Sequence, residues 1–212
     1  MMKLYGYWRS SASYRVRIAF NLKGIEIEHH PVNLKAGQQH LESHKSLNAQ
    51  PLVPILELED GTRLTQSLAI LDYLEETYPK PSLLPAESVF RAQIKAASQI
   101  IGTDIAPIQN LRVLKYIRAE HDQDDASVKD WAAHWITEGF HALERIVQKD
   151  EHPFFMMDRP GYFECSLIPQ IYNANRYNVD MTKFPKLSKI NEACLKRLAF
   201  IKSLPENQLD AS

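Results

Sequence analysis

The first eighty residues alternate between short runs with strand character and longer segments with helical spacing of apolar residues. A run rich in β-forming residues covers 4–7 and predicts the first strand. Val16, Ala19 and Phe20 then recur at the spacing of one helix face, and Gly24 supplies a common helix stop. We therefore expect a strand followed by a helix that ends at Gly24.

Three further strands and a second strong helix follow from the same pattern. Alternation with period two predicts a strand over 25–28, and apolar runs predict strands over 53–58 and 62–64 around a turn at 59–61. Residues 39–45 favour a short helix, and a stronger helix begins at Ser67 and ends before Pro79. This order is typical of an α/β domain in which a parallel strand pair shares its sheet with an antiparallel hairpin.

Helical spacing dominates the chain after residues 78–85, a stretch that contains three prolines and is expected to be a linker or a stiff connection. The pattern predicts helices over 89–101, 106–119, 128–149, 163–173 and 185–198. Within the third of these, Trp131 and Trp135 lie one turn apart and are expected in the core. The predicted fold class is α/β plus all-α, with an N-terminal domain over 1–82 and an all-helical domain over 88–212.

Composition and charge exclude several function classes. The 212 residues carry a formal net charge of -1, so no basic excess points to nucleic acid or to an anionic membrane. The chain has no run of about 18 apolar residues, which argues against a transmembrane helix, and its start does not resemble a signal peptide. Two cysteines imply no disulfide framework and suit a reducing cytosol.

The spacing of histidines and cysteines predicts no metal site. His40 and His44 are four residues apart, but Leu41 stands where a zinc-protease motif requires Glu. Both histidines are therefore expected in contact with solvent. Cys165 and Cys194 lack the spacing of a metal motif and are expected to be buried structural thiols.

Two helix starts in the α/β half carry hydroxyl groups. Ser10 and Ser11 lie between the first strand and the first helix, where the free N–H groups and positive dipole end of a helix favour an anion such as a thiolate. Gln66 and Ser67 open the next strong helix and are suited to a ligand carboxylate. Plain helix capping is the alternative at both places.

Pro54 stands at the entrance of the strand predicted over 53–58. Proline cannot donate to a sheet ladder and is confined to strand ends, edges or bulges. A cis bond between Val53 and Pro54 would turn the Val53 backbone outward, where it could pair with an extended peptide ligand.

These motifs together resemble the zeta-class glutathione transferases, a family that includes maleylacetoacetate and maleylpyruvate isomerases. The class-specific segment is RSSASYRVRIA over 9–19. In the first half the resemblance continues over 31–34, 37–39, 52–54, 66–70 and 72–77, and in the second over 109–114, 139–140, 143–144, 168–170 and 173–177. It therefore spans nearly the whole chain.

The resemblance implies a thioredoxin-like N-terminal domain, an all-helical C-terminal domain, a cytoplasmic homodimer, and glutathione as cofactor. By this resemblance, Val53 before a cis Pro54 binds the cysteinyl unit, and Gln66 and Ser67 bind the γ-glutamyl carboxylate. Gln39 contacts the glycyl end, and Ser10 and Ser11 face the sulfur. Asn110 and Arg112 line the site from the helical domain.

The implied reaction is cis–trans isomerisation of maleylacetoacetate or maleylpyruvate in aromatic catabolism, such as tyrosine degradation. Addition of the glutathione thiolate makes the double bond single, rotation follows, and elimination restores a trans bond. Arg9 and Arg176 match positions that bind the substrate carboxylates, for which the planar guanidinium is well suited. A structural ion pair is the alternative for each arginine.

Several positions depart from the family pattern. Ala12 replaces a frequent Cys, which excludes a mechanism that needs that protein thiol, and Ala106 replaces a common His or Gln contact to glutathione. Gly161 and Glu164 stand where a Ser or Thr and an Asp usually begin the core helix. Two alternatives therefore stay open: a transferase that conjugates or dehalogenates small electrophiles, and a non-catalytic binding protein.

Overall fold

The chain folds into two units, and the computed structural model describes residues 1–211 of it. The first unit comprises Met1–Leu83 and the chain from Leu195 onward, and the second comprises Leu84–Cys194. The domain boundary expected between 82 and 88 falls beside this division. The segment from Leu195 onward, which we expected in the second domain, groups with the first unit because α10 (Leu198–Ser203) packs against α1 (Ser11–Lys23).

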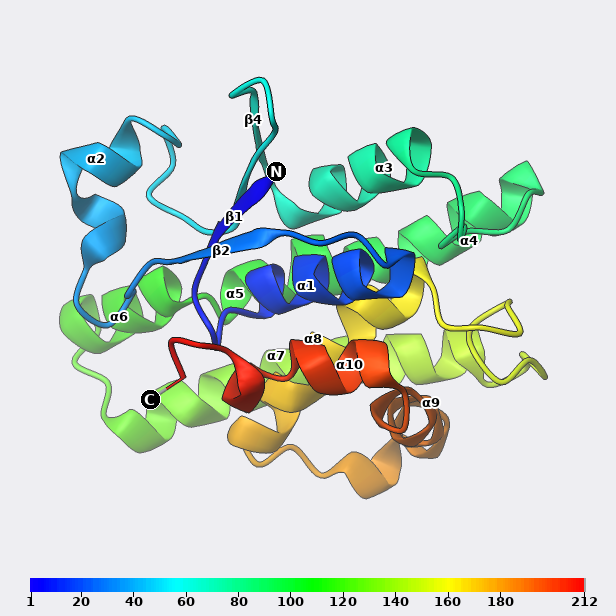
Figure 1. Cartoon of the computed structure of the whole chain (residues 1–212). Helices are drawn as coiled ribbons and strands as arrows, with labels where there is room; N and C mark the ends of the chain where they lie inside the picture. Colours follow the sequence, from blue (N-terminus) through cyan, green and yellow to red (C-terminus); the bar gives the residue numbers. More distant parts are fainter. Residues whose placement is uncertain (212) are drawn as a thin grey trace. The chain divides into compact units, whose positions relative to one another are not determined.

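A four-stranded mixed sheet forms the framework of the first unit (Figure 1). Its elements besides α1 and α10 are β1 (Lys3–Gly6), β2 (Glu28–Pro31), η1 (Gln38–His40), α2 (Glu42–Lys45), β3 (Ile55–Glu57), β4 (Arg63–Thr65), α3 (Ser67–Thr77) and η4 (Pro205–Asn207). The strand order is β2-β1-β3-β4, with β1 parallel to β2 and antiparallel to β3, and β3 antiparallel to β4. The predicted parallel pair and hairpin are therefore confirmed.

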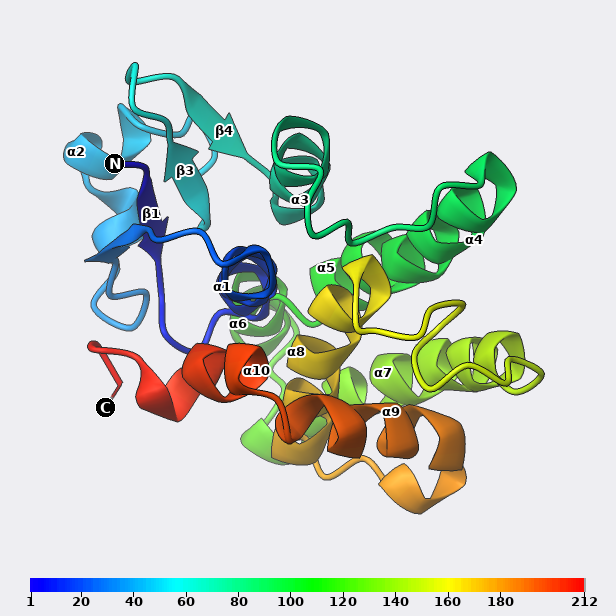
Figure 2. The same cartoon turned by 45° about the vertical axis from the view of Figure 1, so that its right-hand side comes forward.

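Helices α1 and α3 pack against each other and cover one face of the sheet (Figure 2). Leu4 and Leu56 from the strands, together with Ile18 and Leu71 from the helices, are fully buried and form the core of this layer. Removing such side chains from water is the main stabilising contribution to the fold. Gly24 ends α1 at φ 65, in the left-handed region that glycine favours, as the sequence predicted.

A buried ion pair joins the far ends of α1 and α3. Lys23 Nζ lies 2.9 Å from Glu75 Oε2, and it also donates to the Tyr78 and Pro81 carbonyl oxygens. Glu75 in turn accepts from the Leu83 N–H at 2.8 Å. The charges are thus satisfied by hydrogen bonds as well as by each other, as a buried pair requires.

Strand β2 begins three residues later than the sequence pattern predicted. The alternation over 25–28 indicated a strand there, but pairing with β1 selects Glu28–Pro31. The Glu28 N–H donates to the Met2 carbonyl at 3.0 Å, and the Val32 N–H donates to the Gly6 carbonyl at 2.7 Å. Residues 25–27 do alternate between half-buried and exposed side chains, but they form no ladder with β1, so periodicity alone misplaces the strand.

The second unit is built mainly from helices, as predicted, and its one isolated β-bridge within the described residues joins Phe154 and Met157. It contains α4 (Ser88–Gln99), η2 (Ile100–Ile105), α5 (Ala106–Ile108), α6 (Leu111–Glu120), α7 (Asp125–Val147), α8 (Tyr162–Arg176), η3 (Met181–Lys183) and α9 (Pro185–Leu195). The single helix predicted over 106–119 is wrong, because Asn110 caps a new helix by accepting from the Arg112 N–H at 3.1 Å. Within residues 1–211, no helix is both long and apolar enough to cross a bilayer.

The start of α8 shows how Gly161 and Glu164 replace the usual capping residues. Gly161 offers no side-chain acceptor, but Glu164 Oε2 accepts from the Gly161 N–H at 2.8 Å and Oε1 accepts from the Phe155 N–H at 3.0 Å. The carboxyl group is buried, and this burial raises the pKa of Glu164 to about 7. The acidic residue therefore orders the start of α8 without a capping hydroxyl.

Candidate functional site

The sheet register brings the predicted site segments of the first unit to one end of the sheet. Gly6 at the end of β1 pairs with Pro31 at the end of β2, Tyr5 pairs with Ile55 at the start of β3, and Ile55 pairs with Thr65 at the end of β4. The segments that follow β1, β2 and β4, and the one that precedes β3, therefore meet there. Ser10, Ser11, Gln39, Val53, Pro54, Gln66 and Ser67 all lie on these segments.

Ser10 and Ser11 form the start of α1. Ser10 is the N-cap, and its Oγ accepts from the Ser13 N–H at 3.2 Å, so the capping alternative is correct for this residue. Capping uses only a lone pair, however, and leaves the hydroxyl proton available for donation. Among the described residues, neither hydroxyl donates a hydrogen bond to the protein. Both are half-buried, and the first turn of α1 contains no acidic residue.

Gln66 and Ser67 form the start of α3, but Ser67 does not cap it. The N-cap is the exposed Gln66, whose side chain accepts no bond from the helix and whose φ of 66 and ψ of 110 are unusual for a residue other than glycine. Such a conformation costs roughly 1–3 kcal/mol and is typical of functional segments. The Gln66 Nε2 donates to Gln50 Oε1 at 2.8 Å. The first turn of α3 also lacks an acidic residue.

Ser67 is held by Arg15, a residue to which the sequence assigned no role. Arg15 Nη1 donates to Ser67 Oγ at 2.5 Å, and both residues are buried, with 3% and 6% of their surfaces exposed. Because Ser67 Oγ accepts from a cation, its hydroxyl proton is directed elsewhere and can be donated to an anion. The sequence did contain a signal for this contact, because Arg15 lies among apolar residues of the predicted helix and arginine is rarely buried without a partner.

Val53 presents its backbone at the same end of the sheet. The Val53–Pro54 peptide bond is cis, Val53 is half-buried, and no hydrogen bond to its N–H or C=O is found within residues 1–211. The preceding Leu52 carbonyl accepts from Asn48 Nδ2 at 3.2 Å and lies 3.1 Å from His44 Nε2. His44 is therefore buried and structural, and the expectation that it contacts solvent is wrong.

Gln39 lies in η1, on the connection that follows β2. It is buried, and its Oε1 has no hydrogen-bond partner in the described chain. Gln38 Oε1 accepts from the Asn33 N–H at 2.7 Å and stabilises the loop before it. A buried amide with an unsatisfied end is suited to a polar ligand group.

Arg9 directly precedes Ser10 in the first unit. Its guanidinium lies 5.3 Å from the centre of the Trp8 ring, and the described part of this unit supplies no ion pair to it. The structural ion pair considered for Arg9 is therefore not formed within the unit. Its charge is available for an anion.

The second unit contains the other three predicted residues. Asn110 and Arg112 begin α6, where Asn110 Oδ1 serves as the helix cap and its amide nitrogen remains for another acceptor. Arg176 ends α8, donates to Asn173 Oδ1 at 2.9 Å and lies 5.4 Å from the centre of the Tyr177 ring. Tyr177 packs against a hydrophobic cluster that includes Leu114 of α6, so the end of α8 lies beside α6.

Neither the histidines nor the cysteines form a metal site in the described chain. Among residues 1–211, no group of three or more His, Cys, Asp or Glu side chains is gathered as a metal ion would require. Cys165 and Cys194 are buried thiols and form no disulfide within these residues. The residues gathered at this end of the sheet offer hydroxyl, amide, guanidinium and backbone groups.

Comparison with known proteins relates this site to one family. Residues 4–82 match the family model of the glutathione S-transferase N-terminal domain. Maleylacetoacetate isomerase of Dictyostelium discoideum is 44% identical over 210 residues, covering 98% of this chain and 95% of that protein.

Two solved structures extend the similarity to the whole fold. The holo structure of maleyl pyruvate isomerase, a bacterial zeta-class glutathione S-transferase, is 39% identical, with a TM-score of 0.96 over 99% of this chain and 100% of that one. Maleylacetoacetate isomerase from Anaeromyxobacter dehalogenans, with bound dicarboxyethyl glutathione and citrate, is 37% identical, with a TM-score of 0.90 over 100% of this chain and 94% of that one. The expected thioredoxin-like and all-helical architecture is confirmed.

Proposed function

The chain belongs to the zeta-class glutathione transferases, and from this premise we propose how its residues perform glutathione-dependent cis–trans isomerisation of maleylacetoacetate or maleylpyruvate. One observation carries the proposal: two helix N-termini free of acidic residues, each bearing a serine, meet at one end of the sheet. Such an end favours anions through its N–H groups and its dipoles.

The first-unit residues fit a tripeptide that carries a thiol and two carboxylates. The free backbone of Val53 would pair with the backbone of the cysteinyl unit, as an added strand does. Ser67, oriented by Arg15, would donate to the γ-glutamyl carboxylate beside Gln66. The buried amide of Gln39 would receive the glycyl end.

Ser10 and Ser11 would stabilise the thiolate at the start of α1. When bound, glutathione would supply a thiolate that adds to the cis double bond and, after rotation about the resulting single bond, is eliminated so that the double bond re-forms in the trans isomer. The two hydroxyl protons and the N-terminus of α1 lower the pKa of a thiol placed there. Ala12 contributes no thiol, so the nucleophile is borrowed.

Arg9 and Arg176 would bind the carboxylates of the substrate. Arg9 lies next to Ser10 and has no ion pair within its unit, so it can meet a carboxylate close to the thiolate. Arg176 would hold the other end of the substrate. Asn110 and Arg112 would line the site from the helical domain, through the Asn110 amide nitrogen and the exposed Arg112 guanidinium.

We extend the proposal to the assembly and its location. A homodimer is supported by exposed apolar side chains on α4, where Val89 and Phe90 are 58% and 48% exposed. A cytoplasmic location is supported by two buried thiols that form no disulfide in the described chain. We propose a glutathione-binding domain over 1–82 and a substrate-binding domain over 88–212, whose segment from Leu195 onward groups with the first unit.

A substrate comparison tests this function. The purified protein is given maleylacetoacetate, maleylpyruvate or a neutral aryl halide, each with glutathione, and the products are separated. We expect the trans isomer of at least one maleyl acid, at a kcat/KM well above that for conjugation of the halide. Conjugation of the halide without isomerisation would support the transferase alternative, and inactivity on all three would support the binding protein.

A further inference from the structure

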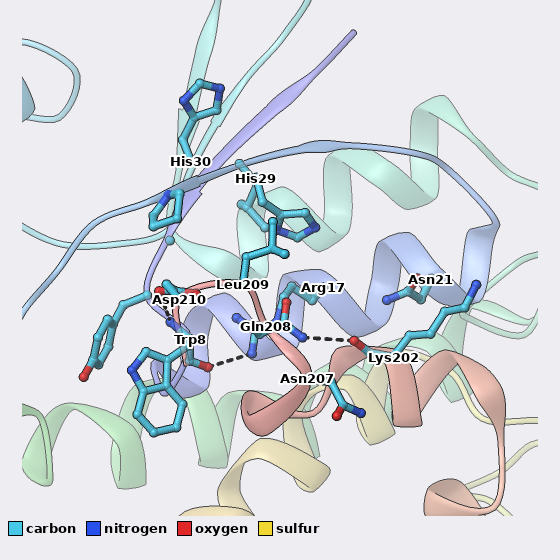
Figure 3. Close-up of a pocket in the computed structure, with 14 residues that line it drawn as sticks. Trp8, Arg17, Asn21, His29, His30, Lys202, Asn207, Gln208, Leu209 and Asp210 are labelled. Atoms are coloured by element: carbon cyan, nitrogen blue, oxygen red, sulfur yellow. Dashed lines mark hydrogen bonds between the residues drawn. The ribbon is translucent and has the colours of Figure 1, made fainter. Parts of the chain in front are cut away.

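The C-terminal segment lies over the loop that carries the proposed thiolate-stabilising serines. Residues 207–210 line a cavity of about 260 Å³ together with Trp8 of that loop, Arg17 of α1 and His29 of β2 (Figure 3). Because a cavity separates residues 207–210 from part of the first unit, apolar packing alone does not fix their position. The hydrogen bonds that these residues make are therefore important for their placement.

Both backbone groups of Trp8 are hydrogen-bonded to side chains outside the loop. The Trp8 N–H donates to Asp210 Oδ2 at 3.0 Å, across 202 positions of sequence. The Trp8 carbonyl accepts from Arg17 Nη2 at 2.8 Å, and the same nitrogen donates to the Ser203 carbonyl at 3.2 Å. The end of the chain therefore contacts Trp8 directly through Asp210 and indirectly through Arg17 and Ser203.

Tyr7, the residue before Trp8, is also hydrogen-bonded through both of its backbone groups. The Tyr7 N–H donates to Ser13 Oγ at 3.4 Å, and the Tyr7 carbonyl accepts from the Ser10 N–H at 3.0 Å. The turn from Tyr7 to Ser10 is therefore pinned at each of these groups. Its placement sets the position of the Ser10 hydroxyl.

Arg17 keeps its charge in this arrangement. Burial lowers the pKa of Arg17 to about 10, still well above neutral pH, with the Tyr14 and Asp210 side chains opposing the shift. Its Nε also donates to the Ser203 carbonyl, at 3.3 Å, and Asn21 Nδ2 donates to Ser203 Oγ at 2.7 Å. Charge-assisted bonds of this kind are stronger than neutral ones.

We propose that the C-terminal segment is a latch for the loop that carries the proposed thiolate-stabilising serines, and that Asp210 is a positioning residue that acts through the Trp8 backbone. The inference rests on the proposed roles of Ser10 and Ser11. Loosening the turn would displace the Ser10 hydroxyl from the thiolate. It would leave the Val53, Gln66 and Ser67 contacts intact, because those residues lie on other segments.

Three full-length variants test the latch. Asp210→Ala removes the acceptor, Asp210→Asn retains an oxygen for the Trp8 N–H, and Glu26→Ala makes the same charge change at an exposed position of the same unit. We expect Asp210→Ala to lower kcat about tenfold and to raise the pKa of the bound glutathione thiol, because small misplacements slow reactions steeply. At a pH below the thiol pKa of both complexes, the dissociation constant for glutathione should stay within about twofold of the parent, because the protonated thiol does not depend on the thiolate contact.

The conservative variant and amide exchange separate positioning from folding. Asp210→Asn should retain most of the parent kcat, and the Trp8 amide of the parent should exchange with solvent as slowly as the amides of β1. The latch is overturned if Asp210→Ala matches Glu26→Ala in kcat and thiol pKa, or if the parent Trp8 amide exchanges as fast as an exposed loop amide. If the parent does not isomerise a maleyl acid, the proposed function fails, whereas the thiol titration and amide exchange still decide the latch.

Discussion

Replacing Ser67 with alanine tests the proposed glutathione site through a single hydroxyl. The hydroxyl accepts from buried Arg15 at 2.5 Å, so its proton is left for another acceptor, which we propose is the γ-glutamyl carboxylate. A hydrogen bond to a charged group contributes roughly 1.5–3 kcal/mol. At about 1.4 kcal/mol for each factor of ten, Ser67→Ala should weaken glutathione binding about ten- to a hundredfold.

The same substitution also removes an acceptor from Arg15. A buried donor left without that acceptor costs roughly 1–3 kcal/mol, so the unfolding free energy should fall by a similar amount. Ser67→Thr keeps the hydroxyl and should keep most of the affinity.

Calorimetric titration with glutathione, paired with thermal unfolding, measures both effects. Ser98→Ala is the matched control, because Ser98 is also buried and its Oγ donates only within its own helix, to the Ile94 carbonyl at 2.9 Å. This control should leave the dissociation constant unchanged. A folded Ser67→Ala protein that binds glutathione as tightly as the parent would refute the assignment of Ser67 to the carboxylate.

Three further predictions concern the thiolate, the substrate and the fold. Replacing Ser10 and Ser11 together with alanine should raise the pKa of the bound glutathione thiol, seen as a shift in thiolate absorbance against pH; an unshifted titration would leave the helix dipole alone responsible. Arg9→Ala and Arg176→Ala should each lower kcat/KM for a maleyl dicarboxylate by about ten- to a hundredfold while sparing a neutral aryl halide, and equal losses on both substrates would make the arginines structural. Because burial raises the pKa of Glu164 from 4.5 to about 7, the fold favours the protonated carboxyl, so the contribution of Glu164 to the unfolding free energy should be greatest below pH 4.5 and should fall by at most ~3 kcal/mol as the pH rises through 7. Denaturant unfolding of Glu164→Gln should lack this slope, and a slope equal to that of the parent would assign it to other groups.

Local signals in the sequence predicted most of the fold. The helix stop at Gly24 and the helix start at Ser67 were correct, because each depends on the residues beside it. The position of β2 was wrong by three residues, because pairing with β1 rather than periodicity selects it. Trp131 was expected in the core but is 38% exposed, and its Nε1 donates to the Ile108 carbonyl at 3.2 Å.

The sequence predicted those residues of the candidate site that belong to recognisable motifs, but not the contacts that hold them in place. The hydroxyls at the two helix starts and the cis bond before Pro54 follow the family motifs. The bond from Arg15 to Ser67 joins positions 52 residues apart; an arginine on a buried helix face indicates that it has a partner but not which residue the partner is. The hydrogen bond from Trp8 to Asp210 joins residues that are 202 positions apart in the sequence, and it becomes visible only in the folded chain, where α10 packs against α1.

Isomerisation with less glutathione than substrate tests the central claim most directly. If the thiolate adds, permits rotation and leaves, each glutathione molecule serves many turnovers and is recovered unchanged. We predict complete conversion of a maleyl acid to its trans isomer at one glutathione per hundred substrate molecules, with full recovery of the free thiol and no reaction when glutathione is omitted. Loss of one thiol for each substrate consumed, or equal rates with and without glutathione, would contradict the account.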